Sequence, residues 1–263
     1  MDLQLQDKRA FISGSTQGIG YAIAAALAAE GASVVLNGRD AARLDAAVER
    51  LRAEQPDARI SGIAADFSDA DDVARLVESL GHVDILVNNV GLFGLADFAS
   101  VTDEDWARYF EVNVMSGVRL SRALIGGMIE RGWGRVVFIS SESGVNVPAD
   151  MVHYGMTKAA MLAVGNGLAK LTRGTSVTVN TVLGGPTFSD GVAASVATVA
   201  GAQSLPVEAM KDAIIAQNRT TLLERFIEPT EIAHLVTYLA SPLSSATNGA
   251  ALRADGGVLT TML

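Results

Sequence analysis

The sequence predicts a doubly wound α/β fold in which about seven parallel strands form one sheet with helices on both faces. Short apolar runs rich in β-branched residues alternate with longer helical patterns along the 263 residues, an order typical of parallel strands joined by covering helices. The apolar runs are nearly continuous, as expected for strands that are covered on both faces. No linker, repeat or low-complexity tract interrupts the alternation, so we expect a single domain over residues 1–263.

The predicted elements follow one another in regular order, and each of the first five strands is followed by a helix. Seven apolar runs are predicted strands, over residues 9–12, 33–36, 60–65, 84–87, 135–139, 176–179 and 250–252. Six segments with the helical spacing of apolar residues are predicted helices, over residues 18–30, 41–54, 69–80, 103–131, 152–172 and 228–240. The stretch 187–203, rich in Ala, Ser and Gly, predicts a loop or weak helix, and we expect a substrate lid near residues 187–225.

Composition and charge exclude several classes of protein. The chain has 20 Lys and Arg residues against 29 Asp and Glu residues, a formal charge of −9, which argues against a nucleic-acid or anionic membrane partner. The absence of cysteine excludes disulfides, thiolate metal sites and a cysteine nucleophile. The three histidines show no paired metal spacing, so no metal site is expected. A polar start without a signal-peptide pattern, and the lack of any run of about 18 apolar residues, predict a cytoplasmic protein.

Between the first predicted strand and the first predicted helix lies a glycine-rich loop with the sequence Gly14-Ser15-Thr16-Gln17-Gly18-Ile19-Gly20. Glycine tolerates a positive φ and leaves room for a ligand. The helix that follows presents free N–H groups and the positive end of its dipole to an anion. The loop therefore predicts a pyrophosphate site, and a tight turn that happens to be rich in glycine is the alternative.

The spacing G-x3-G-x-G of this loop resembles the glycine motif of the short-chain dehydrogenase/reductase family, with Ser13 in place of the family's Thr. The resemblance extends over residues 5–257, and the chain is similar to the 3-oxoacyl-[acyl-carrier-protein] reductases of the family. It implies a Rossmann fold that binds NAD(P) and an oxidoreductase activity. It also implies a homotetramer, because relatives often use the last strand in a tetramer interface.

The end of the second predicted strand, where the adenosine ribose of a dinucleotide is expected, reads Asn37-Gly38-Arg39. An acid there would bind both ribose hydroxyls and repel a 2′-phosphate, whereas a guanidinium binds a phosphate through two charge-assisted hydrogen bonds. Arg39 therefore favours NADP(H). NAD(H) is the alternative cofactor, in which case Arg39 is an ordinary solvated residue at the start of a helix.

Further positions match the family's cofactor contacts. Asp66, next to Phe67, corresponds to the aspartate that binds the adenine amino group, although a helix-start acid is the alternative and Asp69 fits that role better. The segment Asn88-Asn89-Val90-Gly91 resembles the family's N-N-A-G, in which Asn89 supports the sheet and the cofactor ribose.

The loop after the sixth predicted strand has Gly184 where the family has proline, while Gly185 and Thr187 are placed to meet the nicotinamide carboxamide. The candidate cofactor-binding residues are Gly14, Ser15, Thr16, Gln17, Gly18, Ile19, Gly20, Asn37, Arg39, Asp66, Phe67, Asn89, Val90, Gly91, Tyr154, Lys158, Gly185 and Thr187.

Tyr154 and Lys158 lie four residues apart and therefore on one face of the predicted helix over 152–172. A free tyrosine has a pKa near 10. A nearby ammonium, together with the cationic ring of an oxidised nicotinamide, favours the phenolate and lowers this pKa. Tyr154 then acts as general acid in carbonyl reduction and as general base in alcohol oxidation. The resemblance implies that Lys158 also binds the nicotinamide ribose.

Ser141 ends the fifth predicted strand, at the sheet edge where doubly wound folds bind ligands. Its hydroxyl is expected to hold the substrate oxygen beside Tyr154; Ser140 is the rival for this role, and Ser143 is expected to assist or to shape the pocket. Asn113 matches the family's asparagine that bonds a helix carbonyl at a local distortion and supports a water leading to the lysine, with capping of a kink as the plainer alternative. The candidate catalytic residues are Asn113, Ser141, Tyr154 and Lys158, and the candidate substrate-binding residues are Ser141, Ser143 and Tyr154.

Four other residues carry expectations of their own. Glu142, next to the predicted catalytic serine, either contacts a polar or cationic substrate or is exposed to solvent. His153 points about 100° away from the neighbouring tyrosine on a helix and is expected at the surface or the rim of the pocket. Arg131 and Arg135 form a basic patch that could dock an acidic carrier protein.

We therefore predict an oxidoreductase that transfers a hydride between NADP(H) and a small-molecule carbonyl or secondary alcohol, with Tyr154 as general acid and base. The resemblance implies a substrate of the 3-oxoacyl type. The alternatives are an NAD(H)-dependent sugar, polyol or cyclic alcohol dehydrogenase, and an NAD(P)-binding regulator without catalysis. All four predicted catalytic positions are present, which argues against the regulator.

Overall fold

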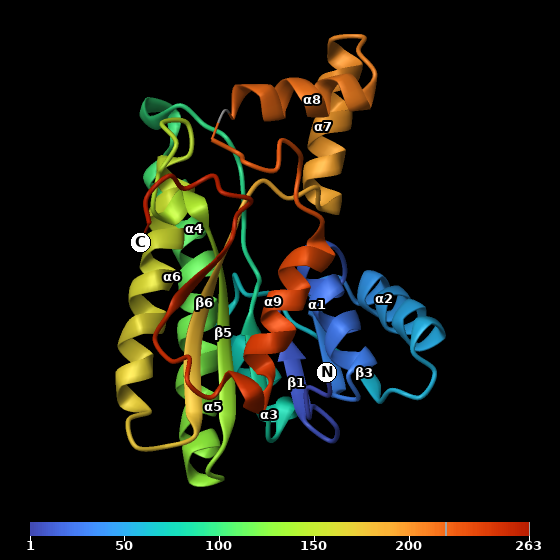
Figure 1. Ribbon diagram of the computed structural model, residues 1–263, viewed down its shortest axis with the longest axis vertical. Helices are drawn as coiled ribbons and strands as arrows, with labels where there is room; N and C mark the ends of the chain where they lie inside the picture. Colours follow the sequence, from blue (N-terminus) through green and yellow to red (C-terminus); the bar gives the residue numbers. More distant parts are fainter. Residues whose placement is uncertain (219, 263) are drawn as a thin grey trace.

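The computed structural model of the protein describes residues 1–218 and 220–262 and is built around a seven-stranded sheet (Figure 1). All neighbouring strands are parallel, in the order β3-β2-β1-β4-β5-β6-β7. β1 lies between β2 and β4, so the chain winds outward from β1 in both directions, as predicted for a doubly wound fold. The strands are β1 (Arg9–Ile12), β2 (Ser33–Gly38), β3 (Ile60–Ala64), β4 (Ile85–Asn88), β5 (Gly134–Ser141), β6 (Val177–Gly184) and β7 (Ala251–Ala254).

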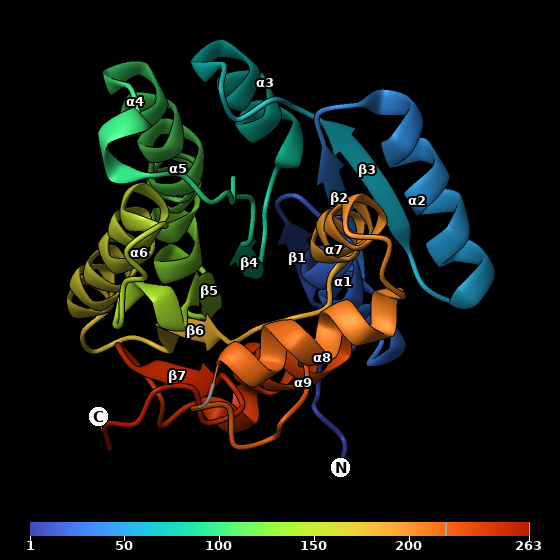
Figure 2. The same ribbon diagram turned by 90° about the horizontal axis from the view of Figure 1, so that it is seen from above.

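Helices cover both faces of this sheet (Figure 2). Apolar side chains of α1, α2 and α9 pack on one face, and those of α3, α5 and α6 pack on the other. Every residue of β5 and β6 is therefore buried, which explains their continuous apolar pattern. The helices are α1 (Gly18–Ala29), α2 (Ala41–Glu54), α3 (Ala70–Leu80), α4 (Asp103–Phe110), α5 (Ser116–Glu130), α6 (Val152–Leu171), α7 (Asp190–Ala202), α8 (Val207–Gln217) and α9 (Pro229–Ala240).

Local side-chain contacts determine where several helices begin. The side chains of Asp40, Asp69 and Thr102 accept hydrogen bonds from backbone N–H groups in the first turns of α2, α3 and α4, which stabilises those helix starts. By contrast, α1 begins after Gln17 without a side-chain cap and without an acid in its first turn. The N-terminus of α1 therefore lacks a local partner for its N–H groups and its dipole.

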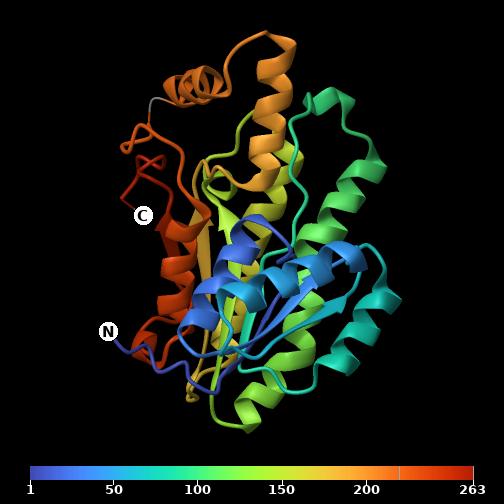
Figure 3. The same ribbon diagram turned by 90° about the vertical axis from the view of Figure 1, so that its right-hand side faces the viewer.

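The structure differs from the sequence prediction in two regions. The single helix predicted near 103–131 is α4 and α5, joined by a π-helical turn at Glu111–Met115. The stretch 187–203 contains the regular helix α7, and α8 follows it, a helix that the sequence pattern did not indicate. Both helices follow β6 and lie beyond the carboxyl ends of the strands (Figures 1 and 3). Within the described part of the chain, no helix is both long and apolar enough to cross a membrane.

Candidate active site

The carboxyl ends of three neighbouring strands bring most of the predicted site residues to one edge of the sheet. The glycine loop follows β1, residues 89–91 follow β4, and Ser141 is the last residue of β5. The direction of winding reverses between β1 and β4, and doubly wound folds bind their ligands at this point.

The glycines of the loop are required by its geometry. Gly14 and Gly18 have φ values of +62° and +60°, which residues other than glycine rarely adopt. A Cβ added to Gly20 would lie 2.4 Å from the Gly14 carbonyl oxygen and 2.5 Å from Nδ2 of Asn89. The start of α1 therefore packs directly on the backbone of the loop, and no larger residue fits at position 20.

Ser13 and Asn89 hold the loop against β4. The buried Ser13 hydroxyl accepts hydrogen bonds from the backbone N–H of Asn89 (2.9 Å) and of Val90 (3.1 Å). Nδ2 of Asn89 donates to the carbonyl oxygens of Ser13 (3.0 Å) and Gly14 (2.8 Å). Asn89 thus supports the junction of β1 and β4. Ser13, noted in the sequence only as a replacement for threonine, is a structural centre of the loop.

Ser15 and Asn37, both predicted to bind the cofactor, have buried side chains whose polar atoms stabilise the loop. The Ser15 hydroxyl donates to the Ile12 carbonyl (2.8 Å) and accepts from the Asn37 N–H (2.9 Å). Oδ1 of Asn37 accepts from Gly14 N–H (3.0 Å), and its Nδ2 donates to the Ile63 carbonyl (3.0 Å). Because these polar atoms already have partners inside the fold, the two side chains position the loop.

Arg39 differs from Asn37, because its side chain is exposed at the end of β2. It forms no hydrogen bond or ion pair with residues 1–218 or 220–262. Thr16 of the loop packs against this strand end, since a Cβ added to Gly38 would come within 2.5 Å of its Cγ2. Gln17, the N-cap of α1, is also exposed. The guanidinium of Arg39 is therefore available to a ligand that lies along the loop.

The N-terminus of α1 is contacted by an acid from a distant part of the chain. Gly18 N–H donates to Oδ2 of Asp190, the first residue of α7, at 2.6 Å. A carboxylate at this place shows that the N-terminus accepts an anion, as the dipole and the uncapped N–H groups require. The close backbone and the N–H donors fit a dinucleotide pyrophosphate. Sequence reasoning missed Asp190, because no local spacing connects it with the loop.

Of the predicted cofactor residues Asp66, Phe67 and Thr187, the first lies near the surface and the other two are buried. Asp66 lies before α3 and accepts from Ser68 N–H (2.9 Å), while Asp69 caps that helix as expected. The Phe67 side chain is buried in the core under α3, so it offers a ligand only its backbone. After β6, Thr187 is buried and donates from its hydroxyl to the Gly185 carbonyl (2.8 Å).

Lys158 and Tyr154 project from α6 toward the end of β5. Nζ of Lys158 donates to the Ile139 carbonyl at 3.0 Å and lies 5.4 Å from the centroid of the Tyr154 ring. A Cβ added to Gly91 would be 3.6 Å from Nζ of Lys158 and 3.5 Å from Oδ1 of Asn113. The segment after β4 therefore meets two of the four predicted catalytic residues, Asn113 and Lys158.

Asn113 occupies the π-helical turn between α4 and α5, a rare distortion that is frequent at functional sites. Its Oδ1 accepts from Leu92 N–H (2.6 Å), and its Nδ2 donates to the Leu92 carbonyl (3.0 Å) and to the Thr157 hydroxyl (3.0 Å). The Thr157 hydroxyl donates in turn to the Tyr154 carbonyl (2.7 Å). Asn113 therefore connects the segment after β4 with the helix that carries Tyr154.

Of the serines at the end of β5 and in the turn after it, Ser140 has a different partner from Ser141 and Ser143. The Ser140 hydroxyl donates to the Lys158 carbonyl at 2.9 Å and so faces the backbone of α6. The Ser141 hydroxyl, next to Tyr154, donates to the Glu142 carboxylate and accepts from Ser143 N–H. The Ser143 hydroxyl donates to the same carboxylate at 3.2 Å. The structure thus places Ser141, and not Ser140, at the phenol.

The charges of the site differ from the sequence expectation at Tyr154. Burial, and then the negative charge of Glu142, raise the pKa of Tyr154, although the Ser141 hydroxyl acts in the opposite direction. Burial lowers the pKa of Lys158 to about 8, against the opposing effect of Glu142. Burial also raises the pKa of Glu142. The predicted lowering of the tyrosine pKa is therefore wrong for the chain by itself, because desolvation and the charge of Glu142 outweigh the hydrogen bond from Ser141.

Two expectations outside the catalytic group are wrong. Arg135 is only 2 % exposed and donates to the backbone carbonyls of Gly134, Ser176 and Ser241, so it contributes to no basic surface patch. His153 is 3 % exposed and packs against Tyr109, with ring centroids 4.4 Å apart. It is a core residue and does not lie at the rim of the site.

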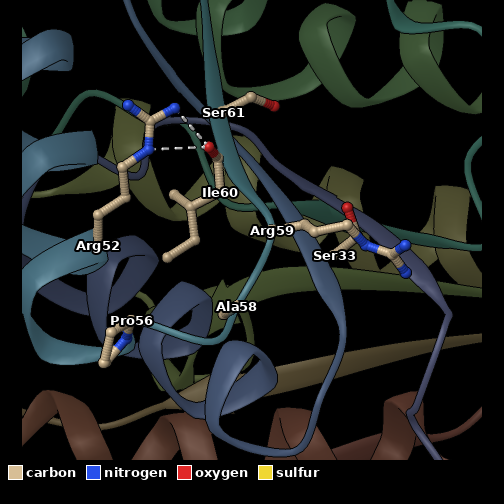
Figure 4. A pocket seen from close by; sticks show the side chains of 7 residues that line it. All are labelled: Ser33, Arg52, Pro56, Ala58, Arg59, Ile60 and Ser61. Atoms are coloured by element: carbon tan, nitrogen blue, oxygen red, sulfur yellow. Dashed lines mark hydrogen bonds between the residues drawn. The ribbon is translucent and has the colours of Figure 1, made fainter.

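A surface hollow of about 480 Å³ lies at the opposite end of the sheet, at the starts of β2 and β3 (Figure 4). Its two arginines already have partners: Arg52 donates to the Ile60 carbonyl and to Glu49, and Arg59 pairs with Asp7 at 2.9 Å. The hollow is remote from the residues described above. Residues 1–218 and 220–262 contain no cluster of three His, Asp or Glu side chains that could hold a metal ion.

Comparison with known proteins agrees with this geometry. Residues 8–200 match the family model described as short chain dehydrogenase. The chain therefore belongs to the short-chain dehydrogenase family of oxidoreductases.

Three relatives illustrate its neighbours in the family. An uncharacterized oxidoreductase of Bacillus subtilis is 44 % identical over 260 residues, with 98 % of each chain covered. A 3-oxoacyl-[acyl-carrier-protein] reductase of Aquifex aeolicus is 29 % identical over 263 residues, covering 98 % of this chain and 100 % of the relative. The crystal structure of L-sorbose reductase from Gluconobacter frateurii, complexed with NADPH and L-sorbose, superimposes with a TM-score of 0.94 at 31 % identity and covers 100 % of both chains. The predicted family and fold class are thus confirmed.

Proposed function

We propose that the protein transfers a hydride between NADP(H) and a carbonyl or secondary alcohol, with Tyr154 as the group that exchanges the proton. The observation that carries this proposal is the arrangement of Tyr154 and Lys158 at the end of β5. The ammonium is 5.4 Å from the phenol ring and is fixed by its hydrogen bond to Ile139. A phenol beside a fixed cation, at the ligand-binding edge of a doubly wound sheet, is suited to general acid–base chemistry.

Each residue of the group has a separate task in this proposal. The bound cofactor supplies the hydride chemistry. Tyr154 donates its proton to the carbonyl oxygen in reduction and, as phenolate, takes the alcohol proton in oxidation. The charge of Lys158 stabilises the phenolate against the desolvation that raises its pKa. Asn113 positions the segment after β4 against α6, and Ser141, next to Tyr154, contacts the substrate.

The cofactor is proposed to lie along the glycine loop. Its pyrophosphate would take the place of the Asp190 carboxylate at the N-terminus of α1, and Arg39 would bind the 2′-phosphate of NADP(H). The guanidinium of Arg39, exposed and without a hydrogen-bond or ion-pair partner among the described residues, supports NADP(H) over NAD(H). The NADPH in the related L-sorbose reductase supports the same choice.

The surroundings of the site complete the proposal. We propose that α7 and α8, within residues 187–225, form the substrate lid, because Thr187 at its start pairs with Ile227 beyond its end. A single domain, a homotetramer and a cytoplasmic location remain predictions. Light scattering after size-exclusion chromatography tests the tetramer.

Two substrate classes follow from the relatives. The 3-oxoacyl reductase of Aquifex aeolicus supports a 3-oxoacyl-like carbonyl, and the L-sorbose reductase of Gluconobacter frateurii supports a sugar or polyol. A panel of both classes, assayed with NADPH and NADH by absorbance at the dihydronicotinamide band, tests the proposed function. Turnover of any member supports an enzyme, whereas tight NADPH binding without any turnover would favour a cofactor-binding regulator.

The choice of cofactor is tested by Arg39→Ala. Loss of a charge-assisted phosphate contact is expected to weaken NADPH binding by roughly 10- to 100-fold and to leave NADH binding almost unchanged. Arg43→Ala, an exposed arginine in the first turn of α2, is the matched control. Equal losses for both cofactors in Arg39→Ala would contradict the assignment of NADP(H).

A further inference from the structure

The turn after β5 presents a carboxylate that the proposed reaction does not use. Glu142 accepts hydrogen bonds from the hydroxyls of both Ser141 and Ser143, and it lies close enough to Tyr154 and Lys158 for its charge to act on both. The turn does not need this side chain to form, because the N–H groups of residues 145 and 146 both donate to the backbone carbonyl of Glu142 at 2.9 Å. The carboxylate is therefore surplus to the local fold.

The negative charge of Glu142 also lacks a direct counterion. It forms no ion pair within residues 1–218 and 220–262, although the side chain is largely removed from solvent. A partly buried charge with only hydroxyl partners is costly to maintain. Such groups are candidates for a functional role when they lie in a ligand-binding region.

Like the Glu142 carboxylate, the hydroxyls of Ser141 and Ser143 are available to a substrate as hydrogen-bond acceptors. Each hydroxyl has its hydrogen directed to Glu142, so what it offers to a ligand is an oxygen lone pair. Ser141, Glu142 and Ser143 together form a corner, hereafter the acceptor corner, that is rich in hydrogen-bond acceptors and carries a negative charge. Tyr154 lies directly beside it and supplies the donor for a carbonyl oxygen.

Apolar side chains also lie around the phenol. The ring of Phe93, which is 52 % exposed, packs edge-on against Tyr154 with centroids 5.9 Å apart. Val147, 41 % exposed, lies against the start of α6 next to Tyr154, within 2.6 Å of a Cβ added to Gly155. A substrate held at the phenol therefore meets hydrocarbon as well as hydrogen-bond acceptors.

We propose that the acceptor corner binds a hydrogen-bond donor, a hydroxyl or an ammonium, carried by the substrate on the carbon next to the reacting carbonyl. The inference rests on the proposed function and narrows its substrate class to α-hydroxy or α-amino ketones and the corresponding alcohols. Oxygens on adjacent carbons are about a hydrogen-bond length apart, and the Ser141 hydroxyl of the corner lies next to the Tyr154 phenol. A 3-oxoacyl thioester brings only carbonyl acceptors to this corner and is disfavoured by it.

Three small ketones of similar size test the proposal: butan-2-one, hydroxyacetone and aminoacetone. We measure kcat/KM with NADPH for the wild type, Glu142→Ala, Glu142→Gln and the matched control Glu104→Gln, an exposed acid of α4. A hydrogen bond to a charged acceptor predicts that the wild type prefers a donor-bearing ketone over butan-2-one by roughly 10- to 100-fold. This ratio is expected to fall to within about threefold in Glu142→Ala and to persist in Glu104→Gln.

The two donor-bearing ketones separate the sources of the preference. If the substrate carries an ammonium, Glu142→Gln loses the preference for aminoacetone as fully as Glu142→Ala does, because the amide has no charge. If it carries a hydroxyl, the amide oxygen still accepts, and Glu142→Gln keeps part of the preference for hydroxyacetone. NADPH titration and thermal unfolding show whether each variant is folded. If Glu142→Ala does not fold, the test is made with Glu142→Gln.

The outcomes also separate this inference from the proposed function. A wild type without preference, or a preference that Glu142→Ala leaves unchanged, overturns the role of the acceptor corner while the ketone reductase activity stands. Absence of turnover with every ketone and every corresponding alcohol contradicts the proposed function, and the inference falls with it.

Discussion

The contact between Asp190 and the N-terminus of α1 gives two linked predictions for the substitution Asp190→Asn. In the chain without cofactor, the carboxylate accepts from Gly18 N–H at 2.6 Å and supplies the negative charge that the uncapped helix lacks. A charge in this position contributes about 0.3–1 kcal/mol. We therefore expect Asp190→Asn to lower the free energy of unfolding by about 0.5–1 kcal/mol.

The same substitution is expected to strengthen cofactor binding. The pyrophosphate must displace the carboxylate from Gly18 and then lie close to its charge, so removing that charge eases both steps. A gain of about 0.3–1 kcal/mol corresponds to a Kd for NADPH that is roughly 2- to 5-fold lower. The gain is expected to shrink between 0.05 and about 1 M salt, since the Debye length falls to about 3 Å there.

Both effects are measured on the same preparations, by chemical unfolding without cofactor and by NADPH fluorescence titration. Asp212→Asn, an exposed acid on α8, is the control and should change neither quantity. Weaker or unchanged NADPH binding in Asp190→Asn would refute the reasoning, because the carboxylate would then not occupy the place of the pyrophosphate.

Three further predictions concern the loop and the site. Gly20→Ala places a Cβ 2.4 Å from the Gly14 carbonyl, so it should weaken NADPH binding and destabilise the fold in thermal unfolding by about 1–3 kcal/mol. Gly126→Ala on α5, where a Cβ meets nothing within 4 Å, should stabilise the fold in the same measurement. Equal effects of the two substitutions would contradict this reasoning. Ser13→Ala leaves two buried N–H groups without their acceptor and should cost about 2–4 kcal/mol in urea unfolding, and a loss well below 1 kcal/mol would count against the assigned contacts. Glu142→Gln removes a charge that raises the pKa of Tyr154, so the phenolate forms at lower pH. The rising limb of the pH profile of kcat/KM for alcohol oxidation should therefore move to lower pH. A shift to higher pH would be inconsistent with the geometry.

The order of the elements could be predicted because the burial of each strand produces a local run of apolar residues in the sequence. β5 and β6 are buried along their whole length, and most of their residues, Arg135 excepted, are accordingly apolar or small. The glycine loop, Ser141, Tyr154 and Lys158 could be located because their residue types and spacing reflect local geometry. The local distortion at Asn113 was expected only from the family resemblance, and the helical pattern itself indicated neither the π-helical turn nor the helix α8. A single extra residue in a helix and a short mixed segment leave no distinct period.

The partners of the side chains could not be predicted in the same way. An asparagine at a strand end gives the same sequence pattern whether its side chain contacts a ligand or, like that of Asn37, forms hydrogen bonds with the backbone of Gly14 and Ile63. Asp190 reaches Gly18 across 172 positions, and the burial of Arg135 depends on carbonyls from other segments. These are tertiary contacts, and the sequence alone carries no spacing that indicates them.

The proton-transfer role of Tyr154 is tested most directly by Tyr154→Phe, with turnover and NADPH binding measured on the same preparation. Removal of the hydroxyl should lower kcat by roughly 10²- to 10⁴-fold and leave the Kd for NADPH nearly unchanged. Tyr238→Phe, a 39 % exposed tyrosine on α9, should behave as the wild type. Turnover within tenfold of the wild type in Tyr154→Phe would contradict the account.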